Sequence, residues 1–424
     1  STSRGLGDVY KRQVALCLVV PFILVRAVLK NHREPEKWSY LAQRMGLAPT
    51  PVVRSKVVWI HAVSVGEVVA TIPLVKRLTQ DYPEHQIILS TTTIDGAKIV
   101  RARLSDFVAH IYFPLDIPSI ISRFLNRVKP VIFIMVETEL WPNSLLECKR
   151  RGIPTVIVNG RLSDKSTTTY QTVESISRQM MSNVSLVLAR SAVDADNFVS
   201  LGLSRDKVRV VGNMKFDSKF SPDVSVERAA DNRSEYGLTV CFASIHGGEL
   251  AIIIDVILRL RRKLPSIQFV IAPRHPTKFE KCTRHLRRHG VNFVSGDYQT
   301  YILKDRALDV FVVDSIGELL EFYSTSDIAF VGGSLVPRGG QNLLEPISVG
   351  VPVITGASLY NFQEIADALT SLGIIVSVSD APRLTNEILD LLQNEEKREN
   401  RSTRGREWLT SKQGATQRAV DALR

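Results

Sequence analysis

From Lys56 onward, short runs rich in Val and Ile alternate with stretches of helical periodicity. The runs are apolar almost throughout, which is typical of strands that are covered on both faces. We therefore predict an α/β fold with doubly wound parallel sheets. The predicted strands are Val57–Ala62, Gln86–Thr91, Val108–Pro114, Val131–Glu137, Thr155–Asn159, Leu186–Ala189, Val208–Val211, Val240–Ser244, Gln268–Ala272, Asn292–Val294, Val310–Val313, Ile328–Val331, Val351–Ile354 and Ile374–Val376.

A polar stretch without a strand pattern, residues 217–236, interrupts this alternation and is predicted to be a linker. It separates an N-terminal domain, residues 30–216, from a C-terminal domain, residues 237–424. We expect two Rossmann-like domains whose strand ends face a cleft. The last segment, Arg383–Arg424, is helical and basic, and is assigned to the second domain; a return onto the first domain stays open.

The N-terminal segment has no strand–helix alternation. Residues 1–13 are predicted to be an unstructured lead, and residues 14–29 form a nearly continuous apolar run. From Arg26 to Lys56 the chain then carries seven Lys and Arg residues against two Glu residues. Basic residues beside an apolar segment attract anionic lipid and favour the cytoplasmic side. We expect a single membrane anchor with the body on the cytoplasmic face of the inner (plasma) membrane; a buried core helix is the alternative.

The chain is basic, with 54 Lys and Arg residues against 43 Asp and Glu residues, so an anionic partner is expected. No nucleic-acid-binding motif accompanies this charge, and we therefore expect an anionic membrane surface and a phosphorylated substrate rather than nucleic acid. Four scattered cysteines form no metal-ligand pattern, which indicates a reducing compartment. We predict no metal and no cofactor.

The glycine-rich stretch between two predicted strands, 332–345, reads GGSLVPRGGQNLLE. Gly333 allows close approach of a ligand to the backbone, and Asn342 and Glu345 follow at the start of a helix-like run. A carboxylate at Glu345 is well placed to accept hydrogen bonds from two sugar hydroxyls. This combination predicts a nucleotide or sugar-nucleotide site, against the alternative of a tight loop in an ordinary α/β domain.

Two strands of the first domain end in acidic residues. Glu67 follows the first strand at the start of a helix, and Glu137 ends the strand 131–137 just before Glu139 and Trp141. Each is a candidate for catalysis, and Glu67 has the position of a general base. Helix capping is the alternative for both residues.

Strand ends of the second domain carry anion-binding residue types. Ser244 and His246 lie in a glycine-containing turn before a long helix, Arg274 and His275 end the next strand, and Gly317 lies in a further strand-to-helix turn. Backbone N–H groups and an Arg fork suit a phosphate. The chain has no GxGxxG sequence and no P-loop, which argues against dinucleotide oxidoreductases and P-loop NTPases.

In order along the chain, these segments are HAVSVGE, YFPLD, VETELWPN, IPTVIVNGRLS, GNMKFD, SIHGGE, PRHP, DSIGEL, GGSLVPRGGQNLLEP and NFQEI. The set resembles the 3-deoxy-D-manno-octulosonic acid (Kdo) transferases, which are membrane-associated glycosyltransferases of the B fold. The resemblance implies metal-independent, inverting transfer of Kdo from CMP-Kdo to the lipid A precursor, lipid IVA, in lipopolysaccharide biosynthesis.

Residue roles follow from the same resemblance. Glu67 matches the family's general base, and Glu137 matches a second acid at the acceptor site. Arg274, Asn342 and Glu345 match positions that bind CMP. Ser244, Gly317 and Gly333 would complete the pocket through backbone or hydroxyl contacts.

Three departures from the family pattern affect the donor site: Gln341 replaces a His, Gly356-Ala357-Ser358 replaces Gly-Pro-His, and Leu250 replaces a second acid. They bear on donor affinity more than on reaction type. The alternatives are another B-fold glycosyltransferase or an epimerase that uses a uridine sugar nucleotide, and a catalytically idle membrane scaffold that binds a nucleotide.

Overall fold

The computed structural model describes residues 36–47, 56–162, 164–217, 238–274, 279–303, 310–315 and 317–424. The predicted lead and anchor, and the predicted linker from residue 218, lie outside the described residues. No helix of the described part is both long and apolar enough to cross a membrane. The chain forms two compact units: the first comprises the described residues up to 217 together with Lys412–Arg424, and the second extends from residue 238 to Ser411.

The first unit is built on a seven-stranded sheet of order β3-β2-β1-β4-β5-β6-β7, in which every pair of neighbours is parallel. Its strands are β1 Lys56–His61, β2 His85–Thr91, β3 Val108–Tyr112, β4 Pro130–Val136, β5 Thr155–Gly160, β6 Leu186–Ala189 and β7 Val208–Val210. Its helices are α2 Lys37–Arg44, α3 Val65–Asp81, α4 Ile94–Leu104, α5 Pro118–Val128, α6 Pro142–Arg150, α7 Asp164–Gln171, α8 Glu174–Met181, α9 Ala192–Ser200, the short 3-10 helices η1 Arg205–Lys207 and η2 Met214–Asp217, and α19 Ala415–Leu423.

Successive residues of the central strand β1 enter two different hydrophobic cores, because side chains alternate between the faces of a sheet. Val57 and Trp59 pack in the core on one face, and Val58 and Ile60 in the core on the other. Trp59 is fully buried, its ring stacks 3.8 Å from that of Phe133, and its indole N–H donates to Ser90 at 2.9 Å. Burial on both faces explains why the strands are apolar almost throughout.

The second unit has the same design, with a parallel sheet of order β10-β11-β9-β8-β12-β13-β14. Its strands are β8 Thr239–Ile245, β9 Gln268–Pro273, β10 Phe293–Gly296, β11 Val310–Val313, β12 Ile328–Val331, β13 Val353–Gly356 and β14 Ile375–Val378. Its helices are α11 Leu250–Lys263, α12 Phe279–Arg288, α13 Tyr298–Leu303, α14 Leu319–Ser324, α15 Leu344–Ser348, α16 Gln363–Ser371, α17 Ala381–Gln393 and α18 Glu395–Lys412. The doubly wound parallel sheets predicted from the sequence are confirmed, and the strand ends shift by at most two residues.

The strand order reverses at one place in each sheet. In the first unit β1 lies between β2 and β4, and in the second β8 lies between β9 and β12. Ligands of open α/β sheets bind beyond the carboxyl ends of the strands at such a reversal. The fold therefore predicts ligand-binding residues in the segments after β1 and β4 in the first unit, and after β8 and β12 in the second.

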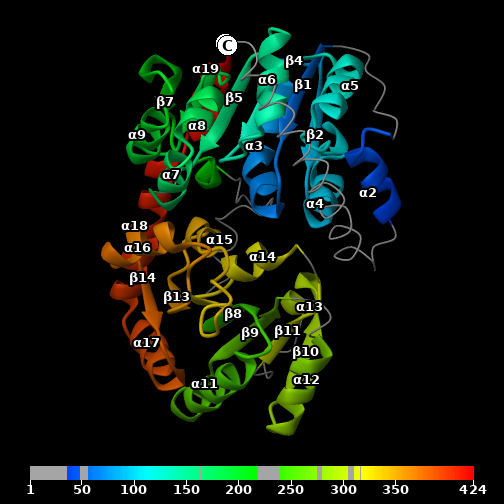
Figure 1. Cartoon of the computed structure of the whole chain (residues 1–424). Helices are drawn as coiled ribbons and strands as arrows, with labels where there is room; N and C mark the ends of the chain where they lie inside the picture. The colour runs from blue at the N-terminus through cyan, green and yellow to red at the C-terminus, as the bar shows by residue number, and fades with distance from the viewer. Residues whose placement is uncertain are drawn as a thin grey trace. The chain divides into compact units, whose positions relative to one another are not determined.

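The C-terminal helix α19 packs on the first unit, against α3 and η2. Figure 1 draws it in red, among the helices and strands of that unit. Ala415, Ala419 and Val420 are fully buried in its core. The Asp217 carboxylate accepts hydrogen bonds from the backbone N–H groups of Gly414, at 2.6 Å, and Thr416. The C-terminal helices were predicted to belong to the second domain, with a return onto the first domain as the open alternative. Residues 412–424 belong to the first unit.

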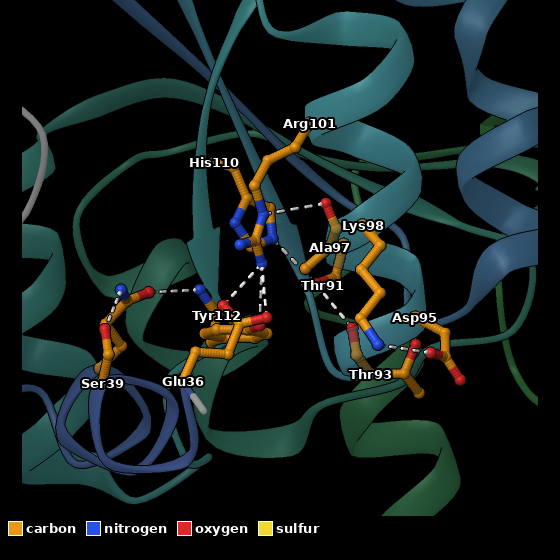
Figure 2. A network of polar contacts seen from close by, with 11 residues as sticks. Glu36, Ser39, Thr91, Thr93, Asp95, Ala97, Lys98, Arg101, His110 and Tyr112 are labelled. Carbon is orange, nitrogen blue, oxygen red and sulfur yellow. Dashed lines mark hydrogen bonds and ion pairs between the residues drawn. The ribbon is translucent and has the colours of Figure 1, made fainter. Parts of the chain in front are cut away.

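The first described helix, α2, is attached to the edge of the first unit by polar contacts with β3 and α4 (Figure 2). Arg101 donates to the Glu36 carboxylate at 2.7 Å and to the Tyr112 hydroxyl at 3.2 Å. The Gln43 side-chain oxygen accepts from the Tyr112 backbone N–H at 2.8 Å. Burial and repulsion from Arg101 lower the pKa of the neighbouring His110 to about 4, so this network contains a neutral imidazole at pH 7.

Candidate active site

Glu67 lies in the first turn of α3, just beyond the carboxyl end of β1. Its side chain turns back toward the preceding loop, where it accepts from the Val63 backbone N–H at 2.7 Å and from the Ser64 hydroxyl at 3.1 Å. Ser64 is the N-cap residue of α3. Val63 precedes this N-cap, and the Ser64 side chain makes no capping bond to the helix backbone, so the reciprocal bonds of a capping box are not formed. The helix-capping alternative for Glu67 holds in a reduced form, in which the carboxylate alone connects the segment before α3 to the first turn.

The same carboxyl has the electrostatics of a base near neutral pH. Its pKa is raised from 4.5 to about 7, first by burial and then by repulsion from Glu137, against the opposing hydrogen bonds and the charge of Lys215. A general base is most effective when its pKa lies near the working pH. Capping and base function are thus compatible in one side chain.

Glu137 directly follows β4, the strand beside β1. Its backbone adopts the left-handed conformation with φ 61°, which turns the chain sharply at the strand end. Its carboxylate forms an ion pair with Lys215 of η2, with 2.8 Å between Oε1 and Nζ. The structure thus brings both predicted acids of the first unit to one edge of the sheet and adds a cation, Lys215, from the GNMKFD segment.

Glu139 is a third acid at this edge that the site prediction did not include. Burial, followed by repulsion from Glu67, raises its pKa to about 7; a hydrogen bond from Trp141 opposes the shift. The alternation VETELW places the two acids two residues apart, and that spacing was the available signal. A pair of groups that titrate near neutrality, beside an acid paired with Lys215, is typical of a catalytic site.

Two further side chains, His61 and Asp116, pack or form hydrogen bonds next to these acids. Burial lowers the pKa of His61 to about 3, so His61 is neutral, and its ring stacks on Phe113 with centroids 4.0 Å apart. The Asp116 carboxylate accepts from the backbone N–H groups of Asn143, at 2.9 Å, and Ser144, at 2.7 Å. These bonds join the YFPLD segment to the start of α6, immediately after the acidic turn.

In the second unit, the turn between β8 and α11 lies beside the glycine-rich loop that follows β12. Ser244 has a left-handed backbone with φ 55°. The His246 ring faces Gln341 with 3.5 Å between their Nε2 atoms, and a Cβ on Gly333 would approach that ring to 3.3 Å. Two predicted residues, His246 and Gly333, therefore lie in adjoining loops, and Ser244 lies near the end of β8, just before the first of them.

The backbone of Gly333 is already occupied within the protein. Its N–H donates to the Glu249 carboxylate at 2.7 Å, and its C=O accepts from the Gly340 N–H at 2.8 Å. The His246 N–H also donates to Glu249, at 2.9 Å. Neither amide can serve a ligand while these bonds persist. The contribution of Gly333 is conformational: its φ of 69° and missing side chain let the loop approach His246.

Asn342 and Glu345 form one polar pair at the start of α15. The Asn342 amide donates to Glu345 Oε1 at 3.1 Å, while its oxygen accepts from the Leu344 N–H at 3.1 Å. Both side chains are half-buried. Ser358, at a departure from the family pattern, binds the same loop by accepting from the Gly339 N–H at 3.3 Å.

The remaining predicted residues lie at neighbouring strand ends. Arg274 is exposed directly after β9, and its backbone N–H donates to the Ile245 C=O at 3.0 Å. Gly317 is exposed after β11 with φ 98°. His275 lies outside the described residues. Among the residues that are described, no group of three His, Cys, Asp or Glu side chains is arranged to bind a metal ion.

Comparison with known proteins gives two family matches along the chain. The family described as 3-deoxy-D-manno-octulosonic-acid transferase matches residues 39–218, and the glycosyl transferases group 1 family matches residues 250–408. The 3-deoxy-D-manno-octulosonic acid transferase of Haemophilus influenzae is 37% identical over 418 residues, which cover 96% of each chain.

Two solved structures are also similar. The UDP-GlcNAc 2-epimerase of Neisseria meningitidis, bound to UDP-GlcNAc, matches with a TM-score of 0.56 at 15% identity and covers 87% of this chain and 99% of its own. The C-terminal CMP-Kdo binding domain of an Acinetobacter baumannii protein is 26% identical, with a TM-score of 0.40, and covers 43% of this chain and 96% of its own. Two parallel-sheet α/β units in one chain are consistent with the glycosyltransferase B fold.

Proposed function

The chain belongs to the Kdo transferase family and is a glycosyltransferase, and from this premise we propose that it transfers Kdo from CMP-Kdo to the lipid A precursor, lipid IVA. The reaction is a step of lipopolysaccharide biosynthesis. An acceptor hydroxyl attacks the anomeric carbon of Kdo, the bond from that carbon to the phosphate oxygen breaks, and CMP leaves. Attack opposite the leaving group inverts the anomeric centre.

The first unit activates the acceptor in this proposal. Glu67 takes the proton of the acceptor hydroxyl as the new carbon–oxygen bond forms. The observation that carries the assignment is the raised pKa of a half-buried carboxyl at the strand-order reversal, beside the Glu137–Lys215 pair. Glu137 supports the acceptor site, and its negative charge favours proton uptake by Glu67.

The second unit binds the donor. Arg274 provides a cationic fork at the end of β9, suited to the phosphate of CMP-Kdo. The amides of Gly247 and Gly248 lead into α11 and favour negative charge, because a helix N-terminus carries partial positive charge. Asn342 and Glu345 are placed to bind the cytidylate, with Ser244, His246 and Gly317 around it. These donors stabilise the charge that gathers on the departing phosphate.

The test of this function is mass spectrometry of a lipid A precursor after incubation with the enzyme and CMP-Kdo in detergent. The proposal predicts a product heavier by one or more Kdo residues, with CMP released. An unchanged precursor, in the presence of folded enzyme, contradicts it.

Nucleotide titration separates the proposed donor from a uridine donor. Calorimetry with CMP and with UDP on the same protein is expected to give tighter binding for CMP. Preference for UDP would instead favour a uridine sugar nucleotide, and no binding of either would contradict the assignment of the donor loops.

We also propose that the enzyme acts at the cytoplasmic face of the inner membrane, attached through its N-terminal segment. The apolar run 14–29 and the basic residues that follow it support this placement. Each Lys or Arg near an anionic surface contributes about 1 kcal/mol to attachment. A lipid acceptor makes such attachment useful, because it concentrates enzyme and substrate in one plane.

A further inference from the structure

Glu249 is a fully buried acid at the N-terminus of α11. Within the described residues, no Lys, Arg or His side chain forms an ion pair with it. Its two oxygens instead accept four backbone N–H groups: Oε2 from His246 at 2.9 Å and Gly333 at 2.7 Å, and Oε1 from Ser334 at 3.0 Å and Leu335 at 2.9 Å. Burial of a carboxylate is costly unless such bonds compensate it.

These bonds connect two loops that are far apart in the sequence. His246 belongs to the turn between β8 and α11, and residues 333–335 begin the glycine-rich loop after β12. The packing between them is tight: a Cβ on Gly332 would lie 2.9 Å from Glu249 Oε2, and a Cβ on Gly248 would lie 3.0 Å from Val336. Glu249 is therefore a fixed joint between the two loops at the strand-order reversal of the second unit.

On the turn, the joint determines which amides remain for a ligand. The His246 N–H is consumed by Glu249, whereas Gly247 and Gly248 are exposed and their N–H groups bond to no other described residue. Because Glu249 fixes the residues before and after them, the two glycine amides are held in one orientation at the start of α11.

On the glycine-rich loop, the residues bonded to Glu249 make further hydrogen bonds that extend toward Asn342 and Glu345. Ser334 accepts from the Gly356 N–H at 2.7 Å through its hydroxyl, and its C=O accepts from the Ser358 N–H at 2.9 Å. The Gly340 N–H donates to Gly333 at 2.8 Å, directly before the segment that leads to Asn342. A shift at residues 333–335 would thus move the start of α15.

We propose that Glu249 is a positioning residue of the donor site. It does not touch the donor, but it fixes the positions of the Gly247 and Gly248 amides relative to the Asn342–Glu345 pair. This inference rests on the proposed donor function of the second unit. It explains why an acid lies beneath a site for an anion: a fully buried carboxylate whose oxygens are each capped by two N–H groups is shielded from the ligand.

The test is the Glu249→Gln variant of the full chain, with Asp327→Asn as a matched control. Asp327 also connects β8 and β12, by accepting from the Thr239 N–H at 2.8 Å, but at the opposite end of the strands. In Glu249→Gln, the new NH2 group faces two N–H donors, so one pair of bonds is lost. We expect calorimetry to show CMP binding weakened about tenfold or more in Glu249→Gln and unchanged in Asp327→Asn.

Hydrogen-exchange mass spectrometry gives a readout of the joint itself. The peptide covering residues 332–343 should exchange faster in Glu249→Gln than in the wild type, while core strands keep their protection. If Glu249→Gln does not fold, Gly332→Ala introduces a Cβ 2.9 Å from both the Glu249 Oε2 atom and the Ser244 C=O, and is expected to weaken CMP binding.

Each outcome decides a different claim. Equal CMP affinity in wild type and folded Glu249→Gln, or equal loss in Asp327→Asn, overturns the positioning role. Unchanged affinity in folded Gly332→Ala does the same. A wild-type protein that binds no CMP contradicts the proposed donor function instead.

Discussion

Glu67 caps α3 through Val63 and Ser64, and the same carboxyl has its pKa raised to about 7. Two substitutions separate these roles. Gln keeps an oxygen that accepts from the Val63 N–H, whereas Ala removes the bond. We expect Glu67→Ala to lose about 1 kcal/mol of unfolding free energy relative to Glu67→Gln, measured by urea denaturation. Equal stability of the two variants would show that the cap contributes nothing.

The two charged neighbours of Glu67 should shift the pH dependence of activity in opposite directions. Glu137 raises the pKa of Glu67 and Lys215 lowers it. The base works deprotonated, so activity should rise with pH through about 7 in the wild type. Glu137→Gln should move this rise to lower pH, and Lys215→Met should move it to higher pH, in profiles of kcat/KM against pH, which report the free enzyme.

The two variants control for each other, because each removes one member of the same ion pair. Loss of the pair alone would change both profiles in the same direction. Shifts of the same sign, or none, would contradict a base at Glu67 that responds to its neighbours.

Single positions were predictable where the sequence places a polar residue at or shortly after the end of an apolar strand, as at Glu67, Glu137 and Ser244. Partners that come from distant segments were not. The amide of Gly333 was expected to be available to the donor, but Glu249, 84 residues earlier in the chain, already accepts from it. Lys215 was not predicted as a site residue for the same reason, because nothing in the sequence around it indicates that it pairs with Glu137.

At the scale of elements, α19 shows how one carboxylate attaches a helix from the far end of the chain. Asp217 accepts from the first amides of α19, and Arg418 donates to the Val211 C=O at 2.8 Å. Negative charge at a helix N-terminus is favourable. Asp217→Ala should therefore lower the unfolding free energy of the full chain by about 1–2 kcal/mol in urea.

Asp421→Ala is the control for this prediction, because Asp421 is exposed on the same helix and its bonds are to Gln417 and Arg424 of that helix. It should change the unfolding free energy by less than about 0.5 kcal/mol. A loss as large as that of Asp217→Ala would mean that helix stability, rather than docking, is being measured.

The strands were predictable because each is a mainly apolar run between polar turns, and β12, for example, begins and ends where the pattern does. The packing of α19 on the first unit was less predictable from the sequence. Its buried face consists mainly of small residues, Ala415 and Ala419 with Val420, which give a weak apolar signal in a basic segment. Which sheet such a helix covers depends on non-local contacts such as those of Asp217.

At the scale of the whole molecule, the net charge of +11 and the basic residues after the apolar run predict binding to anionic vesicles. Sedimentation with vesicles should fall as salt rises, because screening shortens electrostatic attraction. Replacing Arg26, Lys30 and Arg33 by Gln should weaken binding by about 1 kcal/mol per residue. The same number of charges removed from the C-terminal part of α11, at Arg259, Arg262 and Lys263, should weaken binding much less.

A result in which the α11 variant binds as weakly as the N-terminal variant would mean that total charge, rather than the N-terminal segment, attaches the protein. Vesicles without anionic lipid complete the comparison. They should retain only the contribution of the apolar run.

The most direct test of the account is single-turnover mass spectrometry of the lipid A precursor with CMP-Kdo, comparing the wild type with Glu67→Gln at pH 7. Glu67→Gln keeps the capping bond and the donor loops, so CMP affinity should be unchanged while Kdo transfer falls roughly 10²–10⁴-fold. Transfer at the wild-type rate by a variant that has no carboxylate at position 67 would contradict the account.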